Sequence, residues 1–131
     1  MNIGEASKRS TVSAKMIRHY ESLGLLPEVG RSDAGYRQYD DAAIHTLRFI
    51  RRARDLGFSI AEIEQLLALW RNRRRSSRQV KRIALEHAAD LQRRIDAMQS
   101  MRRTLEHLAG CCHGDDRPDC PILDDLAGTP H

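Results

Sequence analysis

Two cysteines near the C-terminus of this 131-residue chain have a spacing that suits metal binding. Cys112 and Cys120 lie eight residues apart, with Gly114 and Pro118 between them. Thiolates are soft ligands that suit Cu(I), and a monovalent ion of this kind accepts two of them in a linear arrangement. A segment that contains glycine and proline can turn back and bring both sulfurs to one ion. The spacing therefore predicts a soft-metal site, with two incidental loop cysteines as the alternative.

The other potential ligands near this pair are less informative. Cys111 could be an accessible spare thiol or a third ligand, whereas His113 and His131 are expected to be solvated. The chain starts MNIGEASKRS, without the apolar segment of a secretory signal. Three cysteines in such a chain argue against a disulfide framework and favour a cytoplasmic location.

Charge is distributed unevenly along the chain. Residues 111–131 hold one basic and five acidic side chains, whereas residues 1–110 hold 21 basic and 13 acidic ones. A basic body is typical of proteins that bind nucleic acid, although a solvated helical surface gives the same count. Aromatic residues, at 5%, are too few for a typical β-sandwich, and no apolar run approaches the ~20 residues of a membrane span. The composition favours a mainly helical chain that does not cross a membrane.

The first 39 residues predict the elements of a winged helix. Two short helices over residues 3–9 and 13–23, joined by a tight turn, are typical of a helix-turn-helix. Ser13 is suited to cap the second helix. Residues 25–39 change to short runs around a glycine-containing loop, which predicts a β-hairpin. A hairpin that follows a helix-turn-helix is a wing.

Two further helices are predicted after the wing. The first begins at Asp40 or Asp41 and ends at Gly57. The second begins where Ser59 and Glu62 have the spacing of a capping box. The large aromatic residues of this region are expected in the core: Phe49, Phe58 and Trp70.

A long helix is predicted over residues 76–110, because no glycine or proline interrupts the sequence before Gly110. Apolar residues recur along it in steps of four and three: Ala84, Ala88, Leu91, Ile95 and Met98. A helix of this length extends roughly 50 Å, and one copy cannot bury such a stripe along its whole length. We therefore expect a homodimer.

The predicted fold class is mainly α, in three parts. Residues 1–75 would form a winged helix-turn-helix DNA-binding domain, residues 76–110 a coiled-coil dimerisation helix, and residues 111–131 a metal-binding loop and tail. Within the tail, residues 122–126 could form one closing turn of helix.

Several stretches of the sequence resemble the MerR family of winged-helix transcription regulators. They are Ile3-Gly4-Glu5-Ala6, Met16-Ile17-Arg18-His19-Tyr20-Glu21, Leu23-Gly24-Leu25, Arg31 with Gly35-Tyr36-Arg37, and Leu56-Gly57-Phe58-Ser59. The loop from Cys112 to Ile122 is similar to the copper-efflux regulator branch. The resemblance implies a homodimer that binds double-stranded promoter DNA and activates transcription when Cu(I) binds. It would do so by distorting the promoter so that RNA polymerase can engage it.

The resemblance also implies roles for individual residues. Those implied to contact DNA are Lys15, Arg18, Tyr20, Arg31, Tyr36, Arg37 and Arg54. Ser77 would lie near the partner's metal loop, where sensors of divalent ions carry a third thiolate, and Lys81 could offset the charge of a bis-thiolate Cu(I) centre. Two positions depart from the family pattern: Thr11 replaces a glycine in the turn between the helices, and His19 replaces an aromatic residue.

Other functions remain as alternatives. An enzyme is disfavoured, since the sequence has no Ser-His-Asp order, no phosphate-binding glycine loop and no HExxH motif. A helical interaction protein would explain the heptads but not the wing or the thiols. A sensor of Zn(II), Cd(II) or Pb(II) would want a thiolate at position 77. Ag(I) and Au(I) share the softness and linear preference of Cu(I), so they remain possible effectors.

Overall fold

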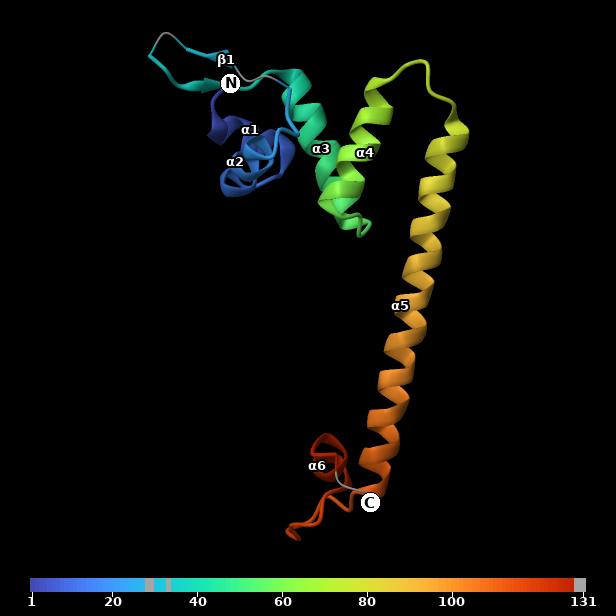
Figure 1. The fold of residues 1–131 in the computed structure, drawn as a ribbon. Coiled ribbons are helices and arrows are strands. Elements are labelled where there is room, and N and C mark those ends of the chain that lie inside the picture. The colour runs from blue at the N-terminus through green and yellow to red at the C-terminus, as the bar shows by residue number, and fades with distance from the viewer. Residues whose placement is uncertain (28–29, 33, 129–131) are drawn as a thin grey trace. The chain divides into compact units, whose positions relative to one another are not determined.

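The computed structural model describes residues 1–27, 30–32 and 34–128. The expectation for His131 lies outside these residues. The chain forms two compact units, Met1–Val80 and Lys81–His131 (Figure 1). The architecture is mainly helical, as the sequence predicts.

A helix-turn-helix opens the first unit. It consists of α1 (Ile3–Ser10) and α2 (Ala14–Ser22). The hydroxyl of Ser13 accepts a hydrogen bond from the Met16 amide at 3.2 Å and so caps the start of α2. Both predicted helices and this N-cap are confirmed.

The turn between the two helices passes through Thr11 in a left-handed conformation, with φ 61° and ψ 20°. Such a conformation costs a residue other than glycine about 1–3 kcal/mol. The Thr11 amide donates to the Ser7 carbonyl at 2.9 Å, and the Thr11 carbonyl accepts from the Arg51 guanidinium. Contacts on both sides of Thr11 therefore hold the threonine in the conformation that glycine adopts more easily.

The predicted wing is confirmed as a short hairpin. The strands β1 (Gly30–Arg31) and β2 (Arg37–Gln38) pair antiparallel, with Arg31 opposite Arg37. Gly35 has φ 84°, which the turn between the strands requires and which glycine adopts without strain.

Two capped helices complete the first unit. Asp40 accepts a hydrogen bond from the backbone at 2.9 Å and caps α3 (Asp41–Asp55). At the start of α4 (Ile60–Arg71), the Ser59 amide donates to the Glu62 carboxylate at 2.9 Å, and the Glu62 amide donates to the Ser59 hydroxyl at 3.2 Å. The predicted capping box is therefore present with both of its hydrogen bonds.

Arginines of α3 and α4 bind backbone carbonyls of the preceding elements. Two guanidinium nitrogens of Arg48 donate to the Arg9 carbonyl, at 2.8 and 3.2 Å. Arg71 donates to the Leu25 carbonyl at 3.1 Å. The Arg9 carbonyl lies in the last turn of α1 and has no partner within that helix, so Arg48 satisfies it. Leu25 follows the end of α2, and Arg71 provides a partner for its carbonyl. Part of the positive charge of α3 and α4 therefore stabilises the fold.

Mostly aliphatic side chains from the four helices, together with Tyr39, form the core of this unit. The largest side chains with less than 2% exposure are Tyr39, Ile17, Ile44, Leu47, Ile50, Ile63, Leu67 and Ser10. Phe58 is also buried, as predicted.

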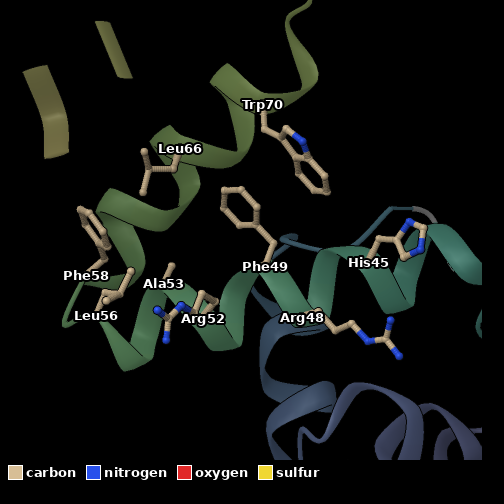
Figure 2. Close-up of a pocket in the computed structure, with 9 residues that line it drawn as sticks. All are labelled: His45, Arg48, Phe49, Arg52, Ala53, Leu56, Phe58, Leu66 and Trp70. Atoms are coloured by element: carbon tan, nitrogen blue, oxygen red, sulfur yellow. The ribbon is translucent and has the colours of Figure 1, made fainter. Parts of the chain in front are cut away.

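Trp70 is not in the core, and the prediction for it is wrong. The side chain is 44% exposed and stacks on the half-buried Phe49, with 4.7 Å between ring centroids and 13° between ring planes. Figure 2 shows the two rings facing each other from α3 and α4. They line an open groove of about 500 Å³ whose walls are mostly apolar. Stacking shields one face of each ring and leaves the other side of the indole open to solvent.

The second unit consists of most of a long helix and a short one. The long helix is α5 (Ser77–Cys111), and the short one is α6 (Pro121–Leu126). Gly110 does not end α5, because the helix continues to Cys111 with glycine inside its last turn. Pro121 begins α6 at a position where proline is tolerated, since its missing N–H would have no helical partner there.

The apolar stripe of α5 is open to solvent in this single chain. Leu91 is 36% exposed, Ile95 47% and Met98 68%. The same face continues with exposed side chains of Met101 and Leu105. Within the described residues, no helix is both long and apolar enough to traverse a bilayer.

Candidate functional site

A groove between α2 and the hairpin brings together four of the residues expected to contact DNA. Arg18 comes from α2, and Arg31, Tyr36 and Arg37 come from the wing. The groove has a volume of about 310 Å³ and is also lined by the first residues of the chain. Tyr36 is 72% exposed, and the three arginines are exposed as well. Three cations and a phenol around one concave surface can bind phosphates and base edges.

Glu21 holds one of these cations in place. Its carboxylate forms an ion pair with the Arg37 guanidinium and accepts a hydrogen bond from the Tyr39 hydroxyl at 3.2 Å. Only 15% of the Glu21 side chain is exposed, against 45% for Arg37. The carboxylate therefore fixes the direction of Arg37 relative to α2. Glu21 is part of the Met16–Glu21 family motif, but the sequence alone did not indicate this role for it.

Tyr39 anchors the end of the wing to the start of the chain. Its amide donates to the Met1 carbonyl at 2.7 Å, and the Met1 ammonium donates to the Tyr39 carbonyl at 2.8 Å. Burial, followed by the negative charge of Glu21, raises the pKa of the Tyr39 phenol above its ordinary value. The phenol therefore stays protonated at neutral pH and remains a donor to Glu21.

The other three predicted DNA contacts lie outside this groove. Lys15 is exposed on α2. Tyr20 is only 5% exposed, so its ring belongs to the core and its role at DNA stays a prediction. Arg54 donates to the Phe58 carbonyl at 3.2 Å near the end of α3. His19, the departure from the family pattern, is exposed beside Tyr20, with 6.0 Å between the ring centroids.

The two cysteines of the predicted metal pair lie at the ends of two helices. Cys112 directly follows the last residue of α5, and its amide donates to the Leu108 carbonyl at 3.1 Å. Cys120 directly precedes α6 as its N-cap residue, with φ −143° and ψ 103°. Both are free thiols and both are half-buried. The backbone of each cysteine is thus anchored by a helix.

The loop between the cysteines has its own internal brace. Asp115 accepts hydrogen bonds from the Arg117 amide and guanidinium, each at 2.9 Å. The hydrogen bond from the Arg117 side chain, followed by the one from its amide, lowers the pKa of the Asp115 carboxyl. A lowered pKa means that the brace is present above the carboxyl's ordinary pKa and is lost as the pH falls through the folded-state value.

Cys111 has a neighbour that sequence reasoning missed. Its Sγ lies 3.9 Å from Nε2 of His107, one turn earlier on α5. The spacing of four residues between His107 and Cys111 could have indicated this contact. The predicted helix, however, ended at residue 110 and left Cys111 outside it. His113 is exposed.

Ser77 and Lys81 are both exposed in the first turns of α5. Lys81 precedes Cys111 by thirty residues on the same helix, which corresponds to about 45 Å. Lys81 can therefore approach a Cys112–Cys120 pair only if that pair belongs to another copy of the chain.

Comparisons with known proteins agree on one family. The sequence model described as "MerR HTH family regulatory protein" matches residues 1–70, and the one described as "MerR, DNA binding" matches residues 44–108. The chain is 63% identical over 127 residues to heavy metal-dependent transcription regulator 2 of Rhizobium meliloti, covering 97% of this chain and 86% of that protein. It is 42% identical to the regulator CueR of Salmonella typhimurium, and the match covers 100% of this chain and 95% of that protein. The crystal structure of PbrR691 from Ralstonia metallidurans in complex with lead(II) matches with a TM-score of 0.85 at 33% sequence identity. The match covers 96% of this chain and 98% of that chain.

Proposed function

Because the chain belongs to the MerR family of helix-turn-helix transcription regulators, we propose that it is a Cu(I)-responsive activator of promoters for copper efflux or detoxification. Members of this family are DNA-binding regulators and not enzymes, and they act as dimers. The relatives identify the chain as a heavy-metal-dependent regulator. The proposal adds the identity of the metal, its ligands and the cytoplasmic site of action.

One observation, the donor set, carries the choice of a soft monovalent ion. Cys112 and Cys120 are free thiols next to the ends of α5 and α6, and the described residues contain no group of three or more side chains suited to hold a metal. Two thiolates complete the shell of a soft monovalent ion, whereas Zn(II) prefers four ligands. Cu(I), Ag(I) and Au(I) all meet this condition. Cu(I) is our choice because the loop is similar to that of copper-efflux regulators.

The residue at position 77 supports the same choice. A partner's Ser77 near the metal loop would supply a hydroxyl in place of the third thiolate of a divalent sensor. Two thiolates and Cu(I) carry a net charge of −1. A partner's Lys81 would reduce that charge.

The exposed stripe of α5 supports dimerisation through that helix. Leu91, Ile95 and Met98 have coiled-coil spacing and are open to solvent in one chain. Burying this stripe against a second copy would place two recognition surfaces on one operator. Each surface would use Arg18, with Arg37 held by Glu21. In the proposed mechanism the occupied thiolate pair stabilises a dimer that distorts the promoter for RNA polymerase.

A divalent sensor is the second candidate, because the lead(II)-bound PbrR691 is similar to this chain in structure. Transcription in vitro with the wild-type protein at buffered free metal distinguishes the two. We expect Cu(I) to raise the transcript level at least about tenfold and Zn(II) to have no effect, since two thiolates leave Zn(II) short of ligands. Ser77→Cys should add a thiolate and permit some response to Zn(II). Strong activation of the wild type by Zn(II) or Pb(II) would support the divalent sensor instead.

Arg18→Ala tests the DNA surface. We expect it to weaken operator binding by about 1–3 kcal/mol for each half-site, which is roughly 5–150-fold each. The slope of log affinity against log salt should fall by about 2, because each of the two copies loses one cation that neutralises a phosphate. Arg78→Ala, which removes an exposed arginine of α5, is the matched control and should change affinity less than about twofold. Fluorescence anisotropy at several salt concentrations measures both quantities. Equal losses from the two variants would contradict this DNA surface.

A further inference from the structure

The last turn of α5 contains a second pair of metal-binding atoms. Cys111 Sγ and His107 Nε2 are 3.9 Å apart, and both residues are exposed. Positions four apart on a helix share one face, and two histidines at this spacing form a known zinc-binding arrangement. α5 continues through Cys111, and the Cys112 amide adds a hydrogen bond to the Leu108 carbonyl at 3.1 Å. The helix therefore holds the two residues one turn apart on the same face.

The distance between these two atoms fits one bridging ion. With the bond lengths known for zinc, about 2.3 Å to a thiolate and about 2.0 Å to an imidazole, one ion would span 3.9 Å at an angle of about 130°. Small rotations of two exposed side chains would open this angle toward linear.

The chemistry of the pair selects a monovalent soft ion. Thiolate and imidazole both suit copper, and one thiolate with one monovalent cation is neutral. Zn(II) would need two further ligands, and the described residues contain no group of three or more suitable side chains. We infer that Cys111 and His107 form an accessory Cu(I) site, separate from the Cys112–Cys120 pair. The choice of Cu(I) rests on the proposed function.

Binding at this site is a ligand exchange without electron transfer. The Cys111 thiol loses its proton to solvent as the sulfur–copper bond forms. The lone pair of Nε2 on the neutral imidazole of His107 forms the second bond, with the ring proton on Nδ1. Because both side chains are exposed, a copper donor in solution can reach this site directly.

Cu(I) titration of the double variant Cys112→Ser/Cys120→Ser tests the inference, because it leaves Cys111 and His107 intact. Under anaerobic, reducing conditions, with a chromophoric Cu(I) chelator as competitor, we expect one Cu(I) per protomer. X-ray absorption should show one sulfur and one nitrogen ligand. Adding His107→Ala to this background should weaken binding at least about tenfold, whereas adding His113→Ala should change it less than about twofold. His113 is the matched control because it is an exposed histidine near the same cysteine.

Absence of Cu(I) binding by the double variant, equal effects of the two histidine substitutions, or a shell of sulfur alone would each overturn the accessory site. The proposed primary site is tested separately with Cys111→Ser/His107→Ala. That variant should still bind one Cu(I) through two sulfurs. Loss of this ion would count against the Cys112–Cys120 pair and not against the accessory site.

Discussion

Replacing Cys120 with serine is expected to abolish Cu(I)-activated transcription while leaving operator affinity within about twofold of the wild type. A hydroxyl is a hard, protonated ligand at neutral pH, so the loop would offer one thiolate where a soft monovalent ion needs two. The loss of Cu(I) affinity should exceed the roughly 10–100-fold that changes in outer-shell partners cost. Cys120 belongs to the Lys81–His131 unit, whereas the DNA groove lies in the Met1–Val80 unit. The substitution should therefore leave DNA binding intact.

Transcription in vitro at buffered free Cu(I), together with operator anisotropy, measures both effects on one protein sample. Cys112→Ser should behave in the same way. Cys111→Ser is the matched control, since it removes a thiol next to the pair and should keep most of the response. Full activation of the Cys120→Ser variant by Cu(I) would show that the two-thiolate site is wrong.

Ile95→Asp is expected to raise the dissociation constant of the dimer at least about a hundredfold and to abolish operator binding at nanomolar protein. Ile95 lies in the middle of the exposed stripe of α5. Dimerisation through this stripe would bury one unpaired carboxylate from each copy, at a cost of several kcal/mol in total. A single copy retains one recognition surface and loses the contacts of the second half-site.

Ser100→Asp is the control for that change, because it adds the same charge to an exposed position of α5 on the opposite side from the stripe. It should leave the dimer unchanged. Sedimentation velocity over a range of protein concentrations measures the dissociation constants. An intact Ile95→Asp dimer would mean that the chains associate through another surface.

The elements that could be predicted from the sequence depend on contacts between near neighbours. The Ser59–Glu62 capping box needs only three residues of separation, and its two hydrogen bonds are present at 2.9 and 3.2 Å. The capped start of α2 at Ser13 is a signal of the same kind. Such patterns are local, so tertiary packing is not needed to recognise them.

The features that could not be predicted depend on how the elements pack or, in one case, on where a helix ends. The Glu21–Arg37 ion pair joins α2 to the wing, and its geometry follows only once both are placed. Trp70 has the apolar character of a core residue, but the pairing of α3 with α4 leaves its ring at the edge of a groove. The Cys111–His107 pair arises because α5 continues one residue beyond the predicted end at Gly110. Glycine disfavours a helix by only about 1 kcal/mol, which neighbouring turns can offset.

The left-handed Thr11 has a consequence for how readily this chain accepts new mutations. Its conformation uses about 1–3 kcal/mol of a folding free energy that is typically only 5–15 kcal/mol. Thr11 is exposed, so a glycine would relieve most of that strain without opening a hole in the core. In a laboratory selection for altered operator or metal preference, Thr11→Gly should therefore appear as a general suppressor. It would rescue substitutions in the recognition helix or the metal loop whose main defect is lost stability.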